Sequence, residues 1–169
     1  MNRSGYATLA CYLLALATFL LDQYVKLSVE TAIALGGTVP LLDGFFHLTH
    51  VRNMGSAFSL FWGKSLFLSV VTSLIVLGLL VYQWRSRSED PLMVFGIGFL
   101  LGGAVGNLVD RLCLGFVRDM FDFRFQGHNV WPIFNIADIA VLLGIGLLML
   151  SRSPKETKET KEIKKTEEP

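Results

Sequence analysis

The sequence predicts an α-helical membrane protein with four antiparallel transmembrane helices. Three observations support this fold class. Hydrophobic residues make up 52% of the 169 residues, and the mean hydropathy is +0.51, both above the usual range for globular proteins. The apolar residues are also concentrated in runs rather than spread periodically. Four of these runs approach the roughly 20 residues that a helix needs to cross a hydrocarbon core of about 30 Å.

The predicted spans cover residues 6–25, 66–84, 92–111 and 132–150. The first run has a second interpretation as a cleaved signal peptide, because Arg3 precedes it and Ala15-Leu16-Ala17 resembles a small-residue cleavage site. The apolar run continues through residues 18–21, beyond that site. We therefore expect an uncleaved first span.

Basic residues beside the spans predict that both termini face the cytoplasm. The side that holds the termini carries nine Lys and Arg residues, at positions 3, 85 and 87 and in the tail, against six over longer segments on the other side. Residues 1–150 form the predicted membrane domain. Residues 151–169 are rich in Lys, Glu and Thr and are predicted to be a disordered, solvated tail.

In this topology the polar side chains of the spans gather at the outer membrane face. The C-terminal ends of the first and third spans share that face with the N-terminal ends of the second and fourth. The polar residues at these ends and in the adjoining loops are Asp22, Lys26, Asn53, Lys64, Asn107, Asp110, Arg111, Asp119, Asn135 and Asp138.

Ordinary ion pairing explains some of these residues better than others. Asp22 and Lys26 can form an i,i+4 pair at a helix end, with Lys26 extending to the interface, and Asp110 can pair with Arg111. Asp138 has no Lys or Arg within one turn on its own span. Because a charge inside a membrane is costly unless it is paired or used, Asp138 is the strongest functional candidate.

The partner of Asp138 must come from another element. The predicted loop over residues 112–131 supplies Asp119 and Asp122, and composition does not choose between them. Two neighbouring carboxylates share a proton and titrate as a coupled pair. Such a pair offers a base to activate water and an acid to protonate a carbonyl oxygen. The interpretation is aspartic-protease chemistry.

Metal and disulfide chemistry are not predicted. The sequence contains no HExxH motif, and His47 and His50 fall on opposite faces of a probable strand. Cys11 and Cys113 lie near opposite ends of their helices in the predicted topology.

The glycines of the third span have two interpretations. Gly98 and Gly102 are expected to serve close helix packing of the small-xxx-small type. For Gly103 and Gly106, close approach of a substrate backbone is an equal alternative.

Five ordered blocks of the chain resemble the bacterial lipoprotein signal peptidases, also called signal peptidase II. The two signature blocks are residues 102–111 (GGAVGNLVDR) and 134–138 (FNIAD). Leu21-Asp22-Gln23 with Lys26, the segment 53–58 (NMGSAF) and the segment 115–119 (GFVRD) are similar to the other three blocks. Met54 departs from the pattern, where a small polar residue is more usual. The resemblance covers about residues 6–150.

The resemblance implies an aspartyl endopeptidase of the bacterial inner membrane, with its active site near the outer face. It implies cleavage of lipid-modified prolipoproteins just before the diacylglyceryl-cysteine, with Asp119, rather than Asp122, and Asp138 as the catalytic dyad. The implied partners are these precursors and membrane lipid, without nucleic acid, metal or cofactor. The oligomeric state is not implied.

The resemblance also implies roles for further residues and a small extracytoplasmic β-rich cradle at about residues 36–61. Strand-like residues 38–42 and 45–51 flank a turn at Asp43-Gly44 and fit that cradle. Structural support is expected from Asp22, Lys26 and Asp110. The residues expected to position substrate or dyad are Asn53, Gly103, Asn107, Arg111 and Asn135.

A proton-coupled membrane transporter or flippase is the alternative function, since Asp and Asn residues inside membranes also line ion paths. That function predicts acids at the midplane and broken helices in paired repeats. The sequence shows neither feature.

Overall fold

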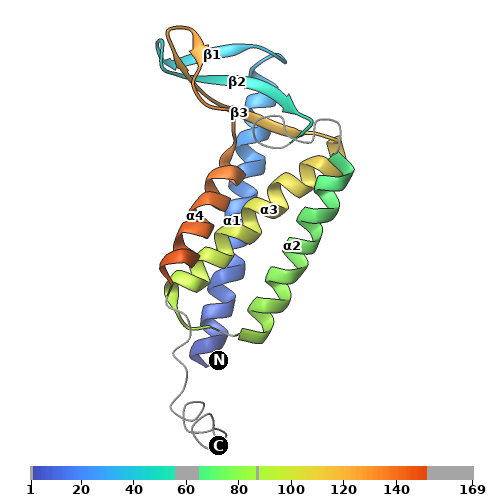
Figure 1. The fold of residues 1–169 in the computed structure, drawn as a ribbon, viewed down its shortest axis with the longest axis vertical. Helices are drawn as coiled ribbons and strands as arrows, with labels where there is room; N and C mark the ends of the chain where they lie inside the picture. Colours follow the sequence, from blue (N-terminus) through green and yellow to red (C-terminus); the bar gives the residue numbers. More distant parts are fainter. Residues whose placement is uncertain (1, 56–64, 87, 152–169) are drawn as a thin grey trace, which may run out of the picture.

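A computed structural model describes residues 2–55, 65–86 and 88–151 of the chain. These residues form apolar helices and a small antiparallel sheet that lies at one end of the helices (Figure 1). The helices are α1 (Arg3–Ala32), α2 (Ser65–Ser86), α3 (Pro91–Leu114) and α4 (Ile136–Leu150), and the strands are β1 (Thr38–Leu42), β2 (Phe46–Asn53), β3 (Val117–Phe125) and β4 (His128–Asn129).

Within the described segments, three helices are long and apolar enough to cross a bilayer, namely α1, α2 and α3 with 30, 22 and 24 residues. Helix α4 is also apolar but has only 15 residues. It begins at Ile136, later than the predicted residue 132, because Asn135 caps it. The Asn135 side chain accepts the backbone N–H of Asp138, and the Asp138 side chain accepts that of Asn135, which is a capping box.

Helix α3 packs against each of the other three helices. Its glycines allow this close approach, as predicted for Gly98 and Gly102. An added Cβ at Gly102 would lie 2.6 Å from the carbonyl oxygen of Ala15 on α1, and one at Gly103 would lie 2.5 Å from that of Ala137 on α4. The structure therefore places Gly103 in the interface between α3 and α4.

The sheet has the strand order β1-β2-β3-β4, with all neighbours antiparallel. The predicted hairpin of β1 and β2 is confirmed. The interpretation of residues 112–131 as a loop is wrong, because β3 pairs with β2 along most of its length. Four charged residues within β3 mask its strand pattern. Residues 56–61 of the expected cradle and the expected tail, 152–169, lie outside the described residues.

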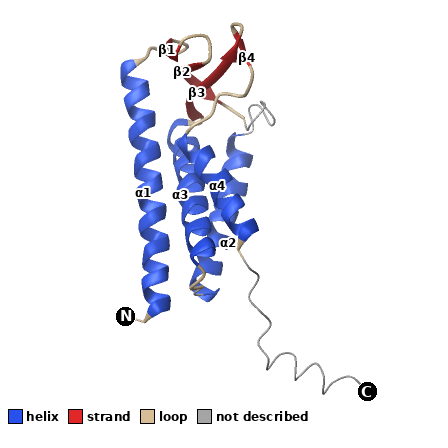
Figure 2. Cartoon of the chain, turned by 90° about the vertical axis from the view of Figure 1, so that its left-hand side faces the viewer, coloured by secondary structure: helices blue, strands red, loops and turns tan. Residues whose placement is uncertain are grey.

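The sheet lies over the C-terminal ends of α1 and α3 and the N-terminal end of α4, far from the start of α1 (Figure 2). One face of β3 rests on α1, where the buried Met120 packs against Val29 and Ile33. The other face of β3 carries Asp119. Asp119 therefore points away from the face of β3 that rests on α1.

Candidate active site

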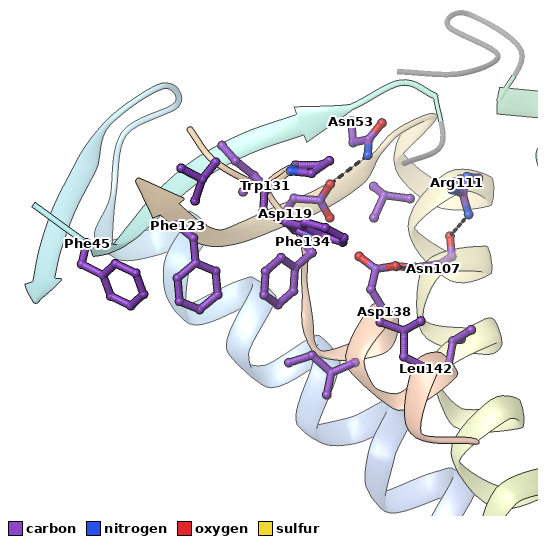
Figure 3. Close-up of a pocket in the computed structure, with 16 residues that line it drawn as sticks. Phe45, Asn53, Asn107, Arg111, Asp119, Phe123, Trp131, Phe134, Asp138 and Leu142 are labelled. Carbon is purple, nitrogen blue, oxygen red and sulfur yellow. Dashed lines mark hydrogen bonds between the residues drawn. The ribbon is translucent and has the colours of Figure 1, made fainter. Parts of the chain in front are cut away.

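A pocket of about 740 Å³ lies between the sheet and helices α3 and α4 (Figure 3). Most of its wall is apolar and comes from β3, α4 and the segment that joins them. The polar side chains that line it are Asn53, Asn107, Arg111, Asp119 and Asp138.

Asp119 enters the pocket from β3, where it pairs with Val51 of β2. It is only 2% exposed. Its Oδ2 accepts a hydrogen bond of 2.9 Å from Asn53 Nδ2, and its Oδ1 accepts one of 2.6 Å from Asn135 Nδ2. Burial and, second, the negative charge of Asp138 raise the pKa of Asp119 to about 7, although both amides favour its anion. Asp119 can therefore hold a proton near neutral pH.

Asp138 enters the same pocket from the first turn of α4. Its Oδ1 accepts a hydrogen bond of 2.8 Å from Asn107 Nδ2, and its Oδ2 accepts one of 3.2 Å from the backbone N–H of Asn135. Figure 3 shows the carboxyl groups of Asp119 and Asp138 directed into one shared space. We call these two residues the acid pair.

Asn135 and Asn107 connect the acid pair to the rest of the protein. Besides its bond to Asp119, Asn135 Nδ2 lies 3.1 Å from Asn107 Oδ1. Asn135 is completely buried. Asn135 therefore donates to Asp119 and Asn107 donates to Asp138, and the two asparagine amides bond to each other, while Asp119 accepts a second amide from Asn53.

Asp22, Lys26, Asp110 and Arg118 form an ion-pair cluster behind the pocket. Lys26 Nζ lies 2.8 Å from Asp22 Oδ2 and 3.2 Å from Asp110 Oδ2. The predicted pair of Asp22 and Lys26 is confirmed. The expectation that Lys26 extends to the interface is wrong, because its ammonium group is enclosed by these carboxylates and is 1% exposed.

Arg118 is the member of this cluster that the sequence interpretation did not select. Arg118 Nη2 donates to Asp110 Oδ1 at 2.7 Å and to Gln23 Oε1 at 2.8 Å, while Nη1 donates to Glu30 Oε2 at 3.0 Å. Burial lowers the pKa of Arg118, but Asp110 and Glu30 outweigh burial and raise it above its usual value. The sequence offered one signal for Arg118. Neighbouring residues of a strand point to opposite faces, so Arg118 lies on the face opposite to Asp119.

Asp110 and Arg111, although adjacent, act in different places. The expected ion pair of Asp110 with Arg111 is wrong, because Asp110 pairs with Lys26 and Arg118. The Arg111 side chain reaches the pocket wall, where Nη2 donates to the Gly55 carbonyl at 3.3 Å. Its guanidinium lies within electrostatic range of both members of the acid pair.

The strand alternation of β3 distinguishes Asp119 from Asp122. Asp122 is completely buried on the opposite face of the strand. There its Oδ2 accepts hydrogen bonds from Thr49 Oγ1 at 2.7 Å and Arg124 Nε at 2.8 Å. Asp122 therefore has its own cation and lies outside the pocket. In the described part of the chain, no group of three or more His, Cys, Asp or Glu side chains is arranged to hold a metal ion.

An apolar helical protein with two carboxyl groups in one largely apolar pocket has the arrangement of a membrane-embedded aspartyl protease. Comparisons with known proteins assign the family. The family model described as signal peptidase (SPase) II matches residues 14–153. A lipoprotein signal peptidase of Halothermothrix orenii is 38% identical over 139 residues, which cover 82% of this chain and 92% of that protein. One of Desulforapulum autotrophicum is 40% identical over 130 residues, 74% of this chain and 80% of that protein.

Solved structures agree with this assignment. A bacterial membrane enzyme solved by the in meso method at 2.3 Å resolution is 30% identical and has a TM-score of 0.76, with 83% of this chain and 85% of that chain covered. A second such structure, at 1.9 Å resolution, has a TM-score of 0.73 at 30% identity and covers 83% of this chain and 90% of that one. The chain belongs to the signal peptidase II family. It is an aspartyl endopeptidase and a bacterial membrane protein.

Proposed function

We propose that this protein removes signal peptides from lipid-modified prolipoproteins, cutting just before the diacylglyceryl-cysteine, with the acid pair as its catalytic dyad. The observation that carries this proposal is the position of the acid pair. Two carboxyl groups from different elements face one apolar pocket and are joined through Asn135. Neither Lys26 nor Arg118, the cations of the ion-pair cluster, lines that pocket.

The surroundings of the two carboxyl groups support different roles in catalysis. Asp119, with a pKa of about 7, holds the shared proton. Asp138 lies in the first turn of α4 and accepts two N–H groups, and both features stabilise a negative charge. This assignment describes the reactive form of the acid pair as a whole.

In that form, Asp138 takes a proton from water as the water oxygen attacks the carbonyl carbon of the scissile peptide bond. Asp119 donates its proton to the carbonyl oxygen, which gives a neutral tetrahedral diol. Asp119 then takes a proton back from one hydroxyl, Asp138 gives its proton to the departing nitrogen, and the C–N bond breaks. The products are a carboxylic acid and an amine, and the dyad regains its starting protonation.

The remaining pocket residues support recognition of a substrate taken from the membrane. A peptide unwound for cleavage exposes backbone polar groups that need partners at membrane depth. Asn53, Asn107 and Arg111 offer such partners, and Asn135 orients the dyad from behind. The apolar wall suits the acyl chains and the signal helix, since each buried methylene contributes about 0.8 kcal/mol.

The proposed location is the bacterial inner membrane, with four spans including α4, cytoplasmic termini and the sheet on the outer side. The start of α1 and the end of α4 lie at the end of the helices away from the sheet (Figure 1). Arg3 and Arg85 are also at that end of their helices, as the positive-inside rule requires. This orientation puts the acid pair near the outer face, where lipid-modified precursors carry their modified cysteine.

The test is a gel-shift cleavage assay with the variants Asp119→Asn, Asp138→Asn and Asp122→Asn in detergent or vesicles. We expect each acid-pair variant to lose turnover by about 10²- to 10⁴-fold, the usual contribution of a general acid or base. Asp122→Asn is the matched control and keeps most turnover, because Asp122 lies on the other face of β3. Thermal unfolding of each variant checks its fold.

The same assay compares the lipid-modified precursor with its unmodified form, which we expect to be cleaved poorly. A chelator should leave the rate unchanged. Retained turnover in either acid-pair variant would remove the dyad from the mechanism, and equal cleavage of the two precursors would contradict the proposed specificity.

A further inference from the structure

Lys26 lies behind the acid pair without lining the pocket. Its ammonium group has three N–H donors, and three acceptors surround it. Two are the carboxylates of Asp22 and Asp110, and the third is Asn107 Oδ1 at 3.0 Å. The two carboxylates account for the charge of Lys26. The third contact connects this charge to the pocket.

That contact determines the orientation of the Asn107 side chain. An ammonium group only donates hydrogen bonds, so the amide must turn its oxygen toward Lys26. Its Nδ2 then points at Asp138 Oδ1, 2.8 Å away. The flipped amide would place N–H groups against the ammonium and an oxygen against a carboxylate. Both contacts would be repulsive, so Lys26 permits only one orientation.

The same constraint extends to the second amide. Asn107 Oδ1, fixed by Lys26, also accepts a hydrogen bond of 3.1 Å from Asn135 Nδ2. The Asn135 side-chain oxygen already accepts a hydrogen bond from the backbone N–H of Asp138, and this is the contact by which Asn135 caps α4. Asn135 Nδ2 is therefore directed at both Asn107 and Asp119.

We propose that Lys26 is a positioning residue for the reaction, because it orients the amides of Asn107 and Asn135 so that each donates to one member of the acid pair. This inference rests on the proposed function and extends it to a residue that touches neither substrate nor reacting atoms. A purely structural ion pair between Asp22 and Lys26 would need no contact with Asn107.

Charge supports the same role. The positive charge of Lys26 lowers the pKa of Asp119, against the larger effects of burial and of Asp138. The other charged groups near the acid pair come from α1, α3 and β3. They are Asp22, Asp110, Arg111 and Arg118.

The experiment measures kcat and KM for cleavage of a lipid-modified precursor by Lys26→Met across the pH range in which the dyad titrates. We expect kcat to fall by about 10²-fold, the cost of misplacing catalytic groups, with KM unchanged because Lys26 lies outside the pocket wall. We also expect the kcat profile to move to higher pH, since the acid pair loses a nearby positive charge.

Arg118→Gln is the matched control. It removes another buried cation from Asp110, but the Arg118 side chain bonds to neither Asn107 nor Asn135. We expect this variant to lower the thermal midpoint while the pH profile of kcat stays in place. The double variant Asp22→Asn/Lys26→Met removes a negative and a positive charge together, and it provides the test if the single variant does not fold.

The outcomes are distinct. A folded Lys26→Met or double variant with the kcat and pH profile of the wild type overturns the inference. A pH profile that moves equally in Arg118→Gln overturns it as well, because general loss of buried charge then explains the effect. If the wild-type protein does not cleave the lipid-modified precursor, the proposed function fails instead.

Discussion

The ion-pair cluster and the acid pair are both built around two aspartates, and β3 contributes Arg118 to the first and, from its other face, Asp119 to the second. In the cluster, Lys26 and Arg118 neutralise the carboxylates at distances of 2.7 to 3.2 Å. In the acid pair, the partners are neutral amides and a backbone N–H group. The difference teaches that a buried aspartate with its own cation holds elements together, whereas one with only amide donors remains free to exchange protons.

The largest expected effect on stability concerns Arg118. Arg118→Gln leaves a buried carboxylate with one cation fewer, and breaking a buried pair in this way costs about 3–5 kcal/mol of unfolding free energy. Thermal or denaturant unfolding in detergent measures this cost. Glu30→Gln is the control, since the Glu30 side chain is 30% exposed and a solvent-exposed ion pair contributes about 0–1 kcal/mol. Equal effects of the two variants would show that the cluster is no more than a surface ion pair.

The second effect is the pH dependence of stability that Asp119 confers. Its pKa rises from 3.8 to about 7 in the folded protein, so the folded state binds this proton more tightly than the unfolded state. The stability that this proton contributes is fully present below about pH 4 and is lost as the pH rises through about 7, by roughly 2–4 kcal/mol in total.

Unfolding midpoints measured across this pH window test that dependence, with Asp119→Asn as the comparison. The variant should lack this part of the pH slope. The same slope in both proteins would mean that Asp119 is ionised at neutral pH, and the acid pair would then resemble the cluster.

The smallest expected effect concerns the packing of α3 against α4 beside the acid pair. Gly103→Ala would place a methyl group 2.5 Å from the carbonyl oxygen of Ala137, next to Asp138. We expect a loss of about 1–3 kcal/mol from overpacking, with a lower kcat because α4 shifts. Gly146→Ala on α4 is the control, since nothing lies within 4 Å of its Cβ position. Unchanged turnover in Gly103→Ala would show that the acid pair tolerates movement of α4.

Apolar runs were sufficient to place the helices, because a membrane requires long apolar segments. The observed α2 and α3 extend the predicted spans by only a few residues at each end. Helix α1 continues to Ala32 through a polar segment that hydropathy does not detect, since contacts with the sheet stabilise it. The start of α4 was missed because the capping box depends on one side-chain geometry.

The polar groups could be found from sequence only in part. The absence of a Lys or Arg within one turn on its own span is enough to single out Asp138 as a functional candidate. The choice between Asp119 and Asp122 depends on how β3 pairs with β2, which is a long-range property. For the same reason the role of Arg118 and the burial of Lys26 could not be predicted, since both depend on which helices surround them.

The short length of α4 has a consequence for the surrounding lipid. At about 1.5 Å per residue, the 15 residues of α4 span only about 22 Å, whereas the 30 residues of α1 span about 45 Å. A hydrophobic segment shorter than the bilayer is accommodated by local thinning. With α4 as the fourth span of the proposed arrangement, we expect the headgroup layer to dip beside it, next to the pocket that its residues line. Such a dip would bring a lipid-anchored peptide to the carboxyl groups while its acyl chains stay in hydrocarbon.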